Sequence, residues 1–238
     1  MTTSETASPA VRTNALSAPP VRARAAVLTA VATVVVLVLV GFVLRAAPLD
    51  LALSRAVHHL HASALAPLAE AFYRALKPLP AAGIMLVATA GVGWGTRRWQ
   101  AALMFLGTVA VTWGSAETAK LLVDRPRPGL AHAAVPVIGS VTDASFPSGH
   151  VAFTASFALA LVFVLWNTRW RVAAVVGGVL LVAGMSVSVV VIGVHYAGDV
   201  VASVLWVAGV FPAVRAGGAI LVARLDARLA RRRSRIGT

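Results

Sequence analysis

Three short motifs hold most of the residues in this chain that could perform chemistry on a substrate. Cationic side chains, a Ser-Gly turn and two histidines are the groups that bind a phosphate and attack its phosphorus. The motifs are distant in the sequence, so they form one site only where the fold brings them together. They are Lys120-x6-Arg127-Pro128, Pro147-Ser148-Gly149-His150 and His195-x3-Asp199.

The third motif pairs a histidine with a carboxylate four residues later. On a helix this spacing places both side chains on one face, about 6 Å apart along the axis. Asp199 could then accept a hydrogen bond from one imidazole nitrogen of His195, which leaves the other nitrogen as a nucleophile with a lone pair. A structural His–Asp hydrogen bond near the end of a membrane span has the same spacing, so the pair alone does not decide its role.

The second motif predicts an anion site at the start of a helix. Pro147 and Gly149 shape a turn that leads into an apolar segment. Backbone N–H groups at such a helix start, together with the Ser148 hydroxyl, bind anions readily. His150 would then stand beside a bound phosphate, where it could act as a general acid.

The first motif supplies positive charge. A lysine near the end of an apolar span is costly unless it pairs with another group or lines a polar cavity. One interpretation of Lys120 is an ion pair with Glu117, three residues earlier. The functional interpretation adds Arg125 and Arg127, whose planar guanidinium groups suit phosphate oxygens.

Composition predicts that helices in a membrane position these motifs. Apolar residues make up 59% of the 238 residues, charged residues 12%, and the mean hydropathy is +0.85. Apolar runs without alternation indicate helices, because lipid offers no partner for an open backbone. We therefore expect an all-α, polytopic membrane protein with six transmembrane helices of roughly 20 residues each. The spans run approximately over 25–44, 79–95, 100–120, 149–168, 172–192 and 196–214.

The distribution of basic residues predicts the orientation. Six spans put both termini on one side, and that side holds fourteen of the 21 lysines and arginines. The positive-inside rule then places both termini in the cytoplasm and the three motifs on the extracytoplasmic side of the cell membrane. The third, fourth and sixth spans each carry a motif at the end that faces this side.

Two terminal segments flank the six-span region 25–214. Residues 1–24 are rich in Ser, Thr, Pro and Ala and predict a disordered cytoplasmic tail. The apolar run that follows is too long for a cleaved signal peptide, so we expect an uncleaved first span. Residues 215–238 predict a basic amphipathic tail that contacts anionic lipids of the inner leaflet. The net charge of +13 comes mostly from this tail and the loops, so we expect no nucleic-acid partner.

Between the first two spans, residues 50–77 predict a short extracytoplasmic interfacial helix and a second, weaker one. His58, His59 and His61 lie there, but no carboxylate or cysteine stands at ligand spacing. We interpret them as interface histidines rather than as a metal site. The chain has no cysteine, so neither disulfides nor thiol chemistry support the predicted site.

Taken together, the motifs resemble those of the type-2 phosphatidic acid phosphatase superfamily. Its pattern is Lys-x6-Arg-Pro, then Pro-Ser-Gly-His, then Ser-Arg-x5-His-x3-Asp. The resemblance implies that His195 is the phosphorylated nucleophile, Asp199 its orienting partner and His150 the acid that protonates the leaving oxygen. It also implies a phosphate bound by four further residues and no metal or other cofactor. Those four are Lys120, Arg127, Ser148 and Gly149.

One position departs from the family pattern. Counting back from His195, the Ser-Arg pair of the pattern falls on Ser188 and Val189, so the third-motif arginine is missing. A charge-assisted hydrogen bond contributes about 1.5–3 kcal/mol, so its loss would slow phosphoryl transfer about 10- to 150-fold unless Arg125 compensates.

The function that we expect is metal-independent dephosphorylation of a lipid phosphate or diphosphate through a phosphohistidine. Undecaprenyl diphosphate, phosphatidylglycerophosphate and phosphatidic acid all fit this expectation. Two alternatives stay open: a catalytically impaired protein that binds or transports lipid head groups, and a lipid phosphotransferase. The sequence leaves the oligomeric state undetermined.

Overall fold

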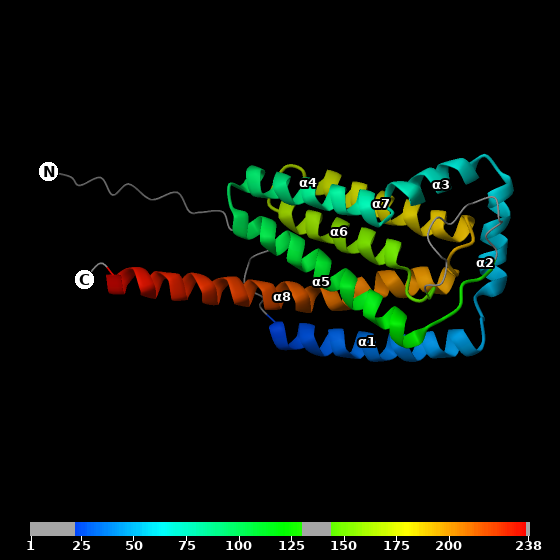
Figure 1. The fold of residues 1–238 in the computed structure, drawn as a ribbon, viewed down its shortest axis with the longest axis horizontal. Coiled ribbons are helices and arrows are strands. Elements are labelled where there is room, and N and C mark those ends of the chain that lie inside the picture. Colours follow the sequence, from blue (N-terminus) through cyan, green and yellow to red (C-terminus); the bar gives the residue numbers. More distant parts are fainter. Residues whose placement is uncertain (1–21, 130–143, 237–238) are drawn as a thin grey trace.

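A computed structural model describes residues 22–129 and 144–236 of the chain, and helices form nearly all of them (Figure 1). No strand occurs within these two ranges, which confirms the all-α prediction. The elements are α1 (Ala23–Ala46), α2 (Leu51–His58), the 3-10 helix η1 (His59–Ala62), α3 (Leu65–Ala75), α4 (Pro78–Thr96), α5 (Trp99–Val123), α6 (Gly149–Leu165), α7 (Arg171–Val191) and α8 (Ala197–Ile236).

The long helices form a bundle whose central member is α8. This helix packs on α1, α5 and α6, while α6 also packs on α7 and α5. Figure 1 shows α2 lying across one end of the bundle, and α3 leads from it to α4. The residues expected to form one interfacial helix with a weaker second one therefore form α2, η1 and α3.

Four of the described helices are long and apolar enough to cross a membrane: α1, α4, α7 and the part of α8 from Ala197 to Arg228. The apolar helix α6 is shorter, with 17 residues, and α5 contains the predicted third span. Large apolar side chains such as Leu28, Leu86 and Val179 lie exposed on the outer faces, as in a lipid-facing surface. The protein is thus a multi-pass membrane protein, and the number of six spans stays a prediction.

The last helix is longer than expected. It runs for 40 residues, contains Pro212, and passes without interruption through position 215, where we placed the start of a separate tail. Figure 1 shows its C-terminal part extending beyond the other helices. The contact of this part with lipid stays a prediction, and most of the predicted N-terminal tail lies outside the described residues.

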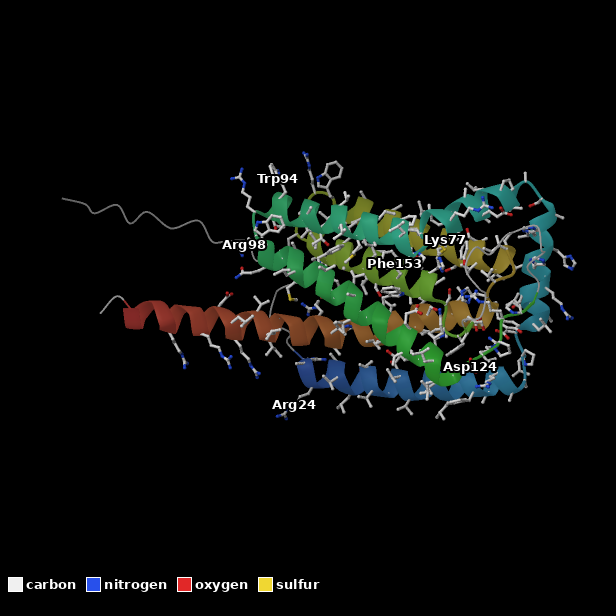
Figure 2. All side chains as sticks on the ribbon, in the orientation of Figure 1. Arg24, Lys77, Trp94, Arg98, Asp124 and Phe153 are labelled. Carbon is white, nitrogen blue, oxygen red and sulfur yellow. The ribbon has the colours of Figure 1, made fainter. Side chains whose placement is uncertain are left out.

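Helix α5 runs from one end of the bundle to the other (Figure 1). Figure 2 shows Arg24 and Arg98 at one end and Asp124 towards the opposite end, where α2 lies. At that opposite end, α5 stops at Asp124, which adopts a left-handed conformation with φ of +48° and donates its N–H to Lys120 O at 2.9 Å. The chain thereby leaves the helix axis, and Arg125 to Arg127 are directed across the end of the bundle.

Candidate active site

The three motifs meet at the end of the bundle that α2 covers. Ser203, one turn after Asp199 on α8, donates its hydroxyl to the carbonyl oxygens of Asp199 at 2.7 Å and Ser148 at 3.0 Å, which joins the second and third motifs. Arg127 Nη1 donates to Val194 O at 2.8 Å, which joins the first and third motifs. The convergence expected from the sequence is therefore present in the fold.

A tight turn between α7 and α8 presents His195. Gly193 adopts a φ of +74°, a conformation that favours glycine, and the N–H groups of Val194 and His195 both donate to Val189 O. The imidazole is almost fully buried, with 1% of its side chain exposed. Its orientation is therefore set by the turn and by its neighbours inside the protein.

Two groups face Nδ1 of His195. The carbonyl oxygen of Ser145 lies at 2.8 Å, within hydrogen-bond distance, whereas Asp199 Oδ2 lies at 3.6 Å. A carbonyl can only accept, so Nδ1 carries the proton and Nε2 keeps the lone pair that a nucleophile needs. The sequence predicted Asp199 as the group that fixes this tautomer. The contact with Ser145 was not predicted, because every residue type has a backbone carbonyl.

The surroundings of His195 keep its imidazole neutral. Burial lowers the pKa of His195 below its ordinary value of 6.5; the nearby Asp199 carboxylate opposes this shift, and the positive charges of Arg127 and Lys120 reinforce it. Because the net shift is downward, the neutral form predominates at neutral pH. This is the form in which Nε2 can attack an electrophile.

Arg125 does not lie among the phosphate ligands where we expected it. Its guanidinium is buried, stacks on the Tyr196 ring at 3.7 Å, and donates to Asp199 Oδ1 at 2.6 Å. It also makes two hydrogen bonds to Asp50, at 2.5 and 3.1 Å. Two carboxylates therefore hold Arg125 in place, and its predicted role as a phosphate ligand does not fit this geometry.

Asp50 is a site residue that sequence reasoning missed. It lies in the turn after α1, and its Oδ2 also accepts the N–H of Gly198 at 2.9 Å, at the start of α8. A side chain at position 198 would collide with this carboxylate, so the close approach requires glycine. The only signal for Asp50 in the sequence is an acidic residue just after an apolar span.

A cavity of about 430 Å³ opens beside the second motif. Its polar end contains Lys120, Arg127, Gly149, His150 and Glu117. Lys120 Nζ pairs with Glu117 Oε2 at 3.1 Å, so the expected ion pair forms while the lysine also lines the cavity. Lys120 is therefore both paired with Glu117 and part of the cavity lining, and its role as a phosphate ligand stays a prediction.

The start of α6 approaches this cavity closely. A Cβ atom on Gly149 would collide with Glu117 Oε1 and lie 3.2 Å from Lys120 Nζ. Glycine is therefore the residue that lets a carboxylate and an ammonium group reach the helix start. Ser148 lies deeper: it is fully buried, and its hydroxyl has no hydrogen-bond partner among the described residues.

Helix α3 covers His150 from the side of α2. The ring of Tyr73 packs against the imidazole with centroids 4.4 Å apart. We did not single out Tyr73, because an aromatic residue on a weak interfacial helix has many packing roles. Its contact confines the ring of His150 at the polar end of the cavity.

Val189 and the interface histidines do not line the cavity. The Val189 side chain is fully buried in the apolar core, and its carbonyl accepts the N–H groups of Val194 and His195 in the α7–α8 turn. His58 Nδ1 lies 2.7 Å from Val191 O, and its ring stacks on that of His61. Within residues 22–129 and 144–236, no group of three or more metal-ligating side chains occurs.

Comparison with known proteins identifies the family. Residues 99–216 match the model of the PAP2 superfamily, and this range contains all three motifs. The chain belongs to this superfamily. Two residues of the candidate site, Asp50 and Tyr73, lie outside the matched range.

The fold of this PAP2 protein is also that of a solved relative. It is similar to the crystal structure of the first transmembrane PAP2-type phosphatidylglycerolphosphate phosphatase from Bacillus subtilis, with a TM-score of 0.60 and 20% sequence identity. The similarity covers 82% of this chain and 96% of the relative. No match was found among curated proteins.

Proposed function

We propose that this PAP2 protein hydrolyses a lipid phosphate or diphosphate, without a metal ion, through a phosphohistidine at His195. The cavity carries the proposal, because it joins a cationic end to an apolar wall. The wall begins at the end of α3 and follows α4 and α5, with Leu76, Pro78, Ala81, Met85, Leu106 and Val109. The cationic end suits a phosphate head group, and the apolar wall suits an acyl or prenyl chain.

The first chemical step uses the neutral imidazole. Nε2 of His195 attacks the phosphorus, the bond between phosphorus and the leaving oxygen breaks, and His150 donates a proton to that oxygen. Lys120, Arg127 and the backbone at the start of α6 stabilise the charge on the phosphoryl oxygens. The products are a dephosphorylated lipid and a phosphorylated His195.

The second step restores the enzyme. Water attacks the phosphorus, the bond to Nε2 breaks, and His150 accepts a proton from the water, so inorganic phosphate leaves and His195 is free again. The Bacillus subtilis relative is a phosphatidylglycerolphosphate phosphatase, which supports a lipid phosphate as the substrate class. Phosphatidylglycerophosphate, phosphatidic acid and undecaprenyl diphosphate all have the required head and tail.

The test is release of inorganic phosphate by the purified protein from lipid phosphates in detergent micelles containing EDTA. We expect wild-type protein to be active there, and His195→Ala to lose about 10³-fold or more of kcat with an unchanged melting temperature. His59→Ala is the matched control, because His59 is exposed on η1. With a phosphate ester whose leaving group needs no proton, His150→Ala should accumulate the phosphoenzyme, because only the water attack then lacks its proton-transfer group.

Three results contradict the proposal in different ways. Wild-type-like turnover by His195→Ala would show that His195 is not the nucleophile. Activity that requires one divalent ion would show that the mechanism depends on a metal. Binding of a lipid phosphate without release of inorganic phosphate would favour the alternative of a catalytically impaired binding protein. The absence of the family's arginine at the buried Val189 favours the same alternative. Release only in the presence of an acceptor alcohol indicates a phosphotransferase.

We also propose that the site faces away from the cytoplasm. The support is the excess of basic residues at the termini and in the loops on their side. Arg24 and Arg98 lie at the end of the bundle opposite the active site, as this orientation requires (Figure 2).

A further inference from the structure

A series of buried charges links the end of the first helix to His195. Arg125 Nη1 donates to Asp50 Oδ2 at 3.1 Å, and Nη2 donates to Asp50 Oδ1 at 2.5 Å. Nη1 also donates to Asp199 Oδ1 at 2.6 Å. Asp50, Arg125 and Asp199 thus form a carboxylate–guanidinium–carboxylate unit, which we call the Asp50 triad.

Asp50 determines how Arg125 is oriented within the triad. A guanidinium held by both oxygens of one carboxylate has a fixed plane, unlike a lysine ammonium. The Tyr196 ring lies against one face of that plane at 3.7 Å. Only 1% of Arg125 and 12% of Asp50 are exposed, so water competes little for these contacts. The position of Nη1 against Asp199 therefore depends on Asp50.

The Asp199 carboxylate connects Arg125 to His195, the proposed nucleophile. Its Oδ1 is held by Arg125, while its Oδ2 accepts the N–H of Tyr196 at 2.9 Å and lies 3.6 Å from His195 Nδ1. The two oxygens belong to one rigid carboxylate, so they rotate together. A displacement of Arg125 would therefore move the oxygen that faces His195.

We infer that Asp50 is a positioning residue for the proposed reaction: through Arg125 it holds the Asp199 carboxylate against His195 and so aligns the nucleophile. The inference rests on the proposed function, because it assigns Asp50 a part in that chemistry. Asp50 does not line the cavity that would hold the substrate. Its loss should therefore lower kcat and leave KM nearly unchanged.

The competing explanation is that Asp50 only caps α8, by accepting the N–H of Gly198. Ser54 makes the same kind of contact, because its hydroxyl accepts the N–H of Ala197 at 3.0 Å. Ser54 lies one helical turn after Asp50, and its hydroxyl donates to the backbone carbonyl of Asp50 at 2.6 Å rather than to the carboxylate that holds Arg125. Ser54→Ala is therefore a matched control that weakens the cap and leaves the triad intact.

The first experiment compares kcat and KM of wild type, Asp50→Asn and Ser54→Ala, with a short-chain phosphatidic acid in detergent micelles. Asp50→Asn preserves the shape of the side chain and removes its charge. We expect its kcat to fall about 10- to 100-fold, the range for one or two charge-assisted hydrogen bonds, with KM within about twofold of wild type. Ser54→Ala should keep kcat within about threefold.

A second variant keeps the inference testable if Asp50→Asn folds poorly because Arg125 loses a partner. Asp50→Asn combined with Arg125→Gln removes one charge of each sign, so the net charge of the triad is unchanged, and the glutamine amide can still donate to Asp199. We expect this double variant to regain the melting temperature of wild type while its kcat stays low. Recovery of kcat together with stability would show that Asp50 only neutralises Arg125, and would overturn the inference.

The outcomes separate the inference from the proposed function. If the wild type is active and Asp50→Asn turns over as fast as Ser54→Ala, the inference is wrong and the proposed function stands. A rise of KM that accounts for the whole loss in kcat/KM also overturns it. If wild-type protein releases no phosphate, or His195→Ala still does, the proposed function fails, and the inference fails with it.

Discussion

At the scale of single residues, His195 is the group whose ionisation should control the reaction. Its pKa is lowered from 6.5 by burial and by Arg127 and Lys120, against the opposing effect of Asp199. The neutral form attacks, so activity is present above the lowered pKa and is lost as the pH falls through it. We therefore predict that the acid limb of kcat/KM lies below pH 6.5.

The measurement is a pH profile of phosphate release with a soluble phosphate monoester. The second pKa of such a substrate lies near 6, so it must be titrated separately and its contribution divided out. An acid limb centred above pH 6.5 would contradict the buried environment of His195.

Val189 is the second residue with a clear expectation, because it replaces the arginine of the family pattern. Its side chain is fully buried in the apolar core, where an arginine would be an unpaired cation. We predict that Val189→Arg costs about 3 kcal/mol or more of stability and does not raise kcat/KM. Thermal unfolding and turnover should be measured together, with Val189→Leu as the control for side-chain size. Faster turnover at an unchanged melting temperature would show that space for the arginine persists beside the phosphate.

Residue types and spacing predicted which motif residues would meet, but not all of their roles. Lys120, Arg127, Gly149 and His150 line the polar end of one cavity, because each lies at the same end of an apolar run, and their binding of phosphate stays a prediction. The role of Arg125 could not be predicted, because it depends on a carboxylate 75 residues away. The contact of His195 with the backbone carbonyl of Ser145 likewise could not be predicted from a pattern of side chains.

At the scale of elements, hydropathy located the long helices, but it could not show where the last one ends. Arginine and alanine are strong helix formers, so a change from apolar to charged residues does not stop a helix. Helix α8 accordingly continues through Arg215, and only its surroundings change. The crossing of α2 over the end of the bundle was also not predictable. An amphipathic pattern shows which face of a helix is apolar, but it does not show how the helix axis is oriented against the bundle.

Helices α4 and α5 should determine how well long lipid chains bind. Ala82 lines the cavity and is exposed, so a larger side chain there narrows the cavity without overpacking the core. We predict that Ala82→Trp raises KM for a long-chain lipid phosphate about tenfold and leaves a soluble phosphate monoester unaffected. Ala90→Trp, at an exposed position of α4 outside the cavity lining, is the control. Equal effects on both substrates would mean that the lipid chain lies elsewhere.

At the scale of the whole molecule, the orientation in the membrane is directly testable because the chain has no cysteine. An impermeant thiol reagent applied to intact cells should label Gly139→Cys, between α5 and α6 and outside the described residues. It should not label Gly95→Cys, near the arginine-rich turn between α4 and α5. The reverse pattern would place the site in the cytoplasm and change the leaflet that supplies the substrate.

The hydrogen bond between Gly198 and Asp50 joins residues 148 positions apart. During synthesis, Asp50 is therefore made long before its partners on α8, and both His195 and Asp199 emerge after all but the last of the long helices. A ribosome that stalls, or a chain cut short within α7, would leave a fragment without His195, the proposed nucleophile, and without Asp199. If the proposed function holds, hydrolysis should begin only when the final helix is in place.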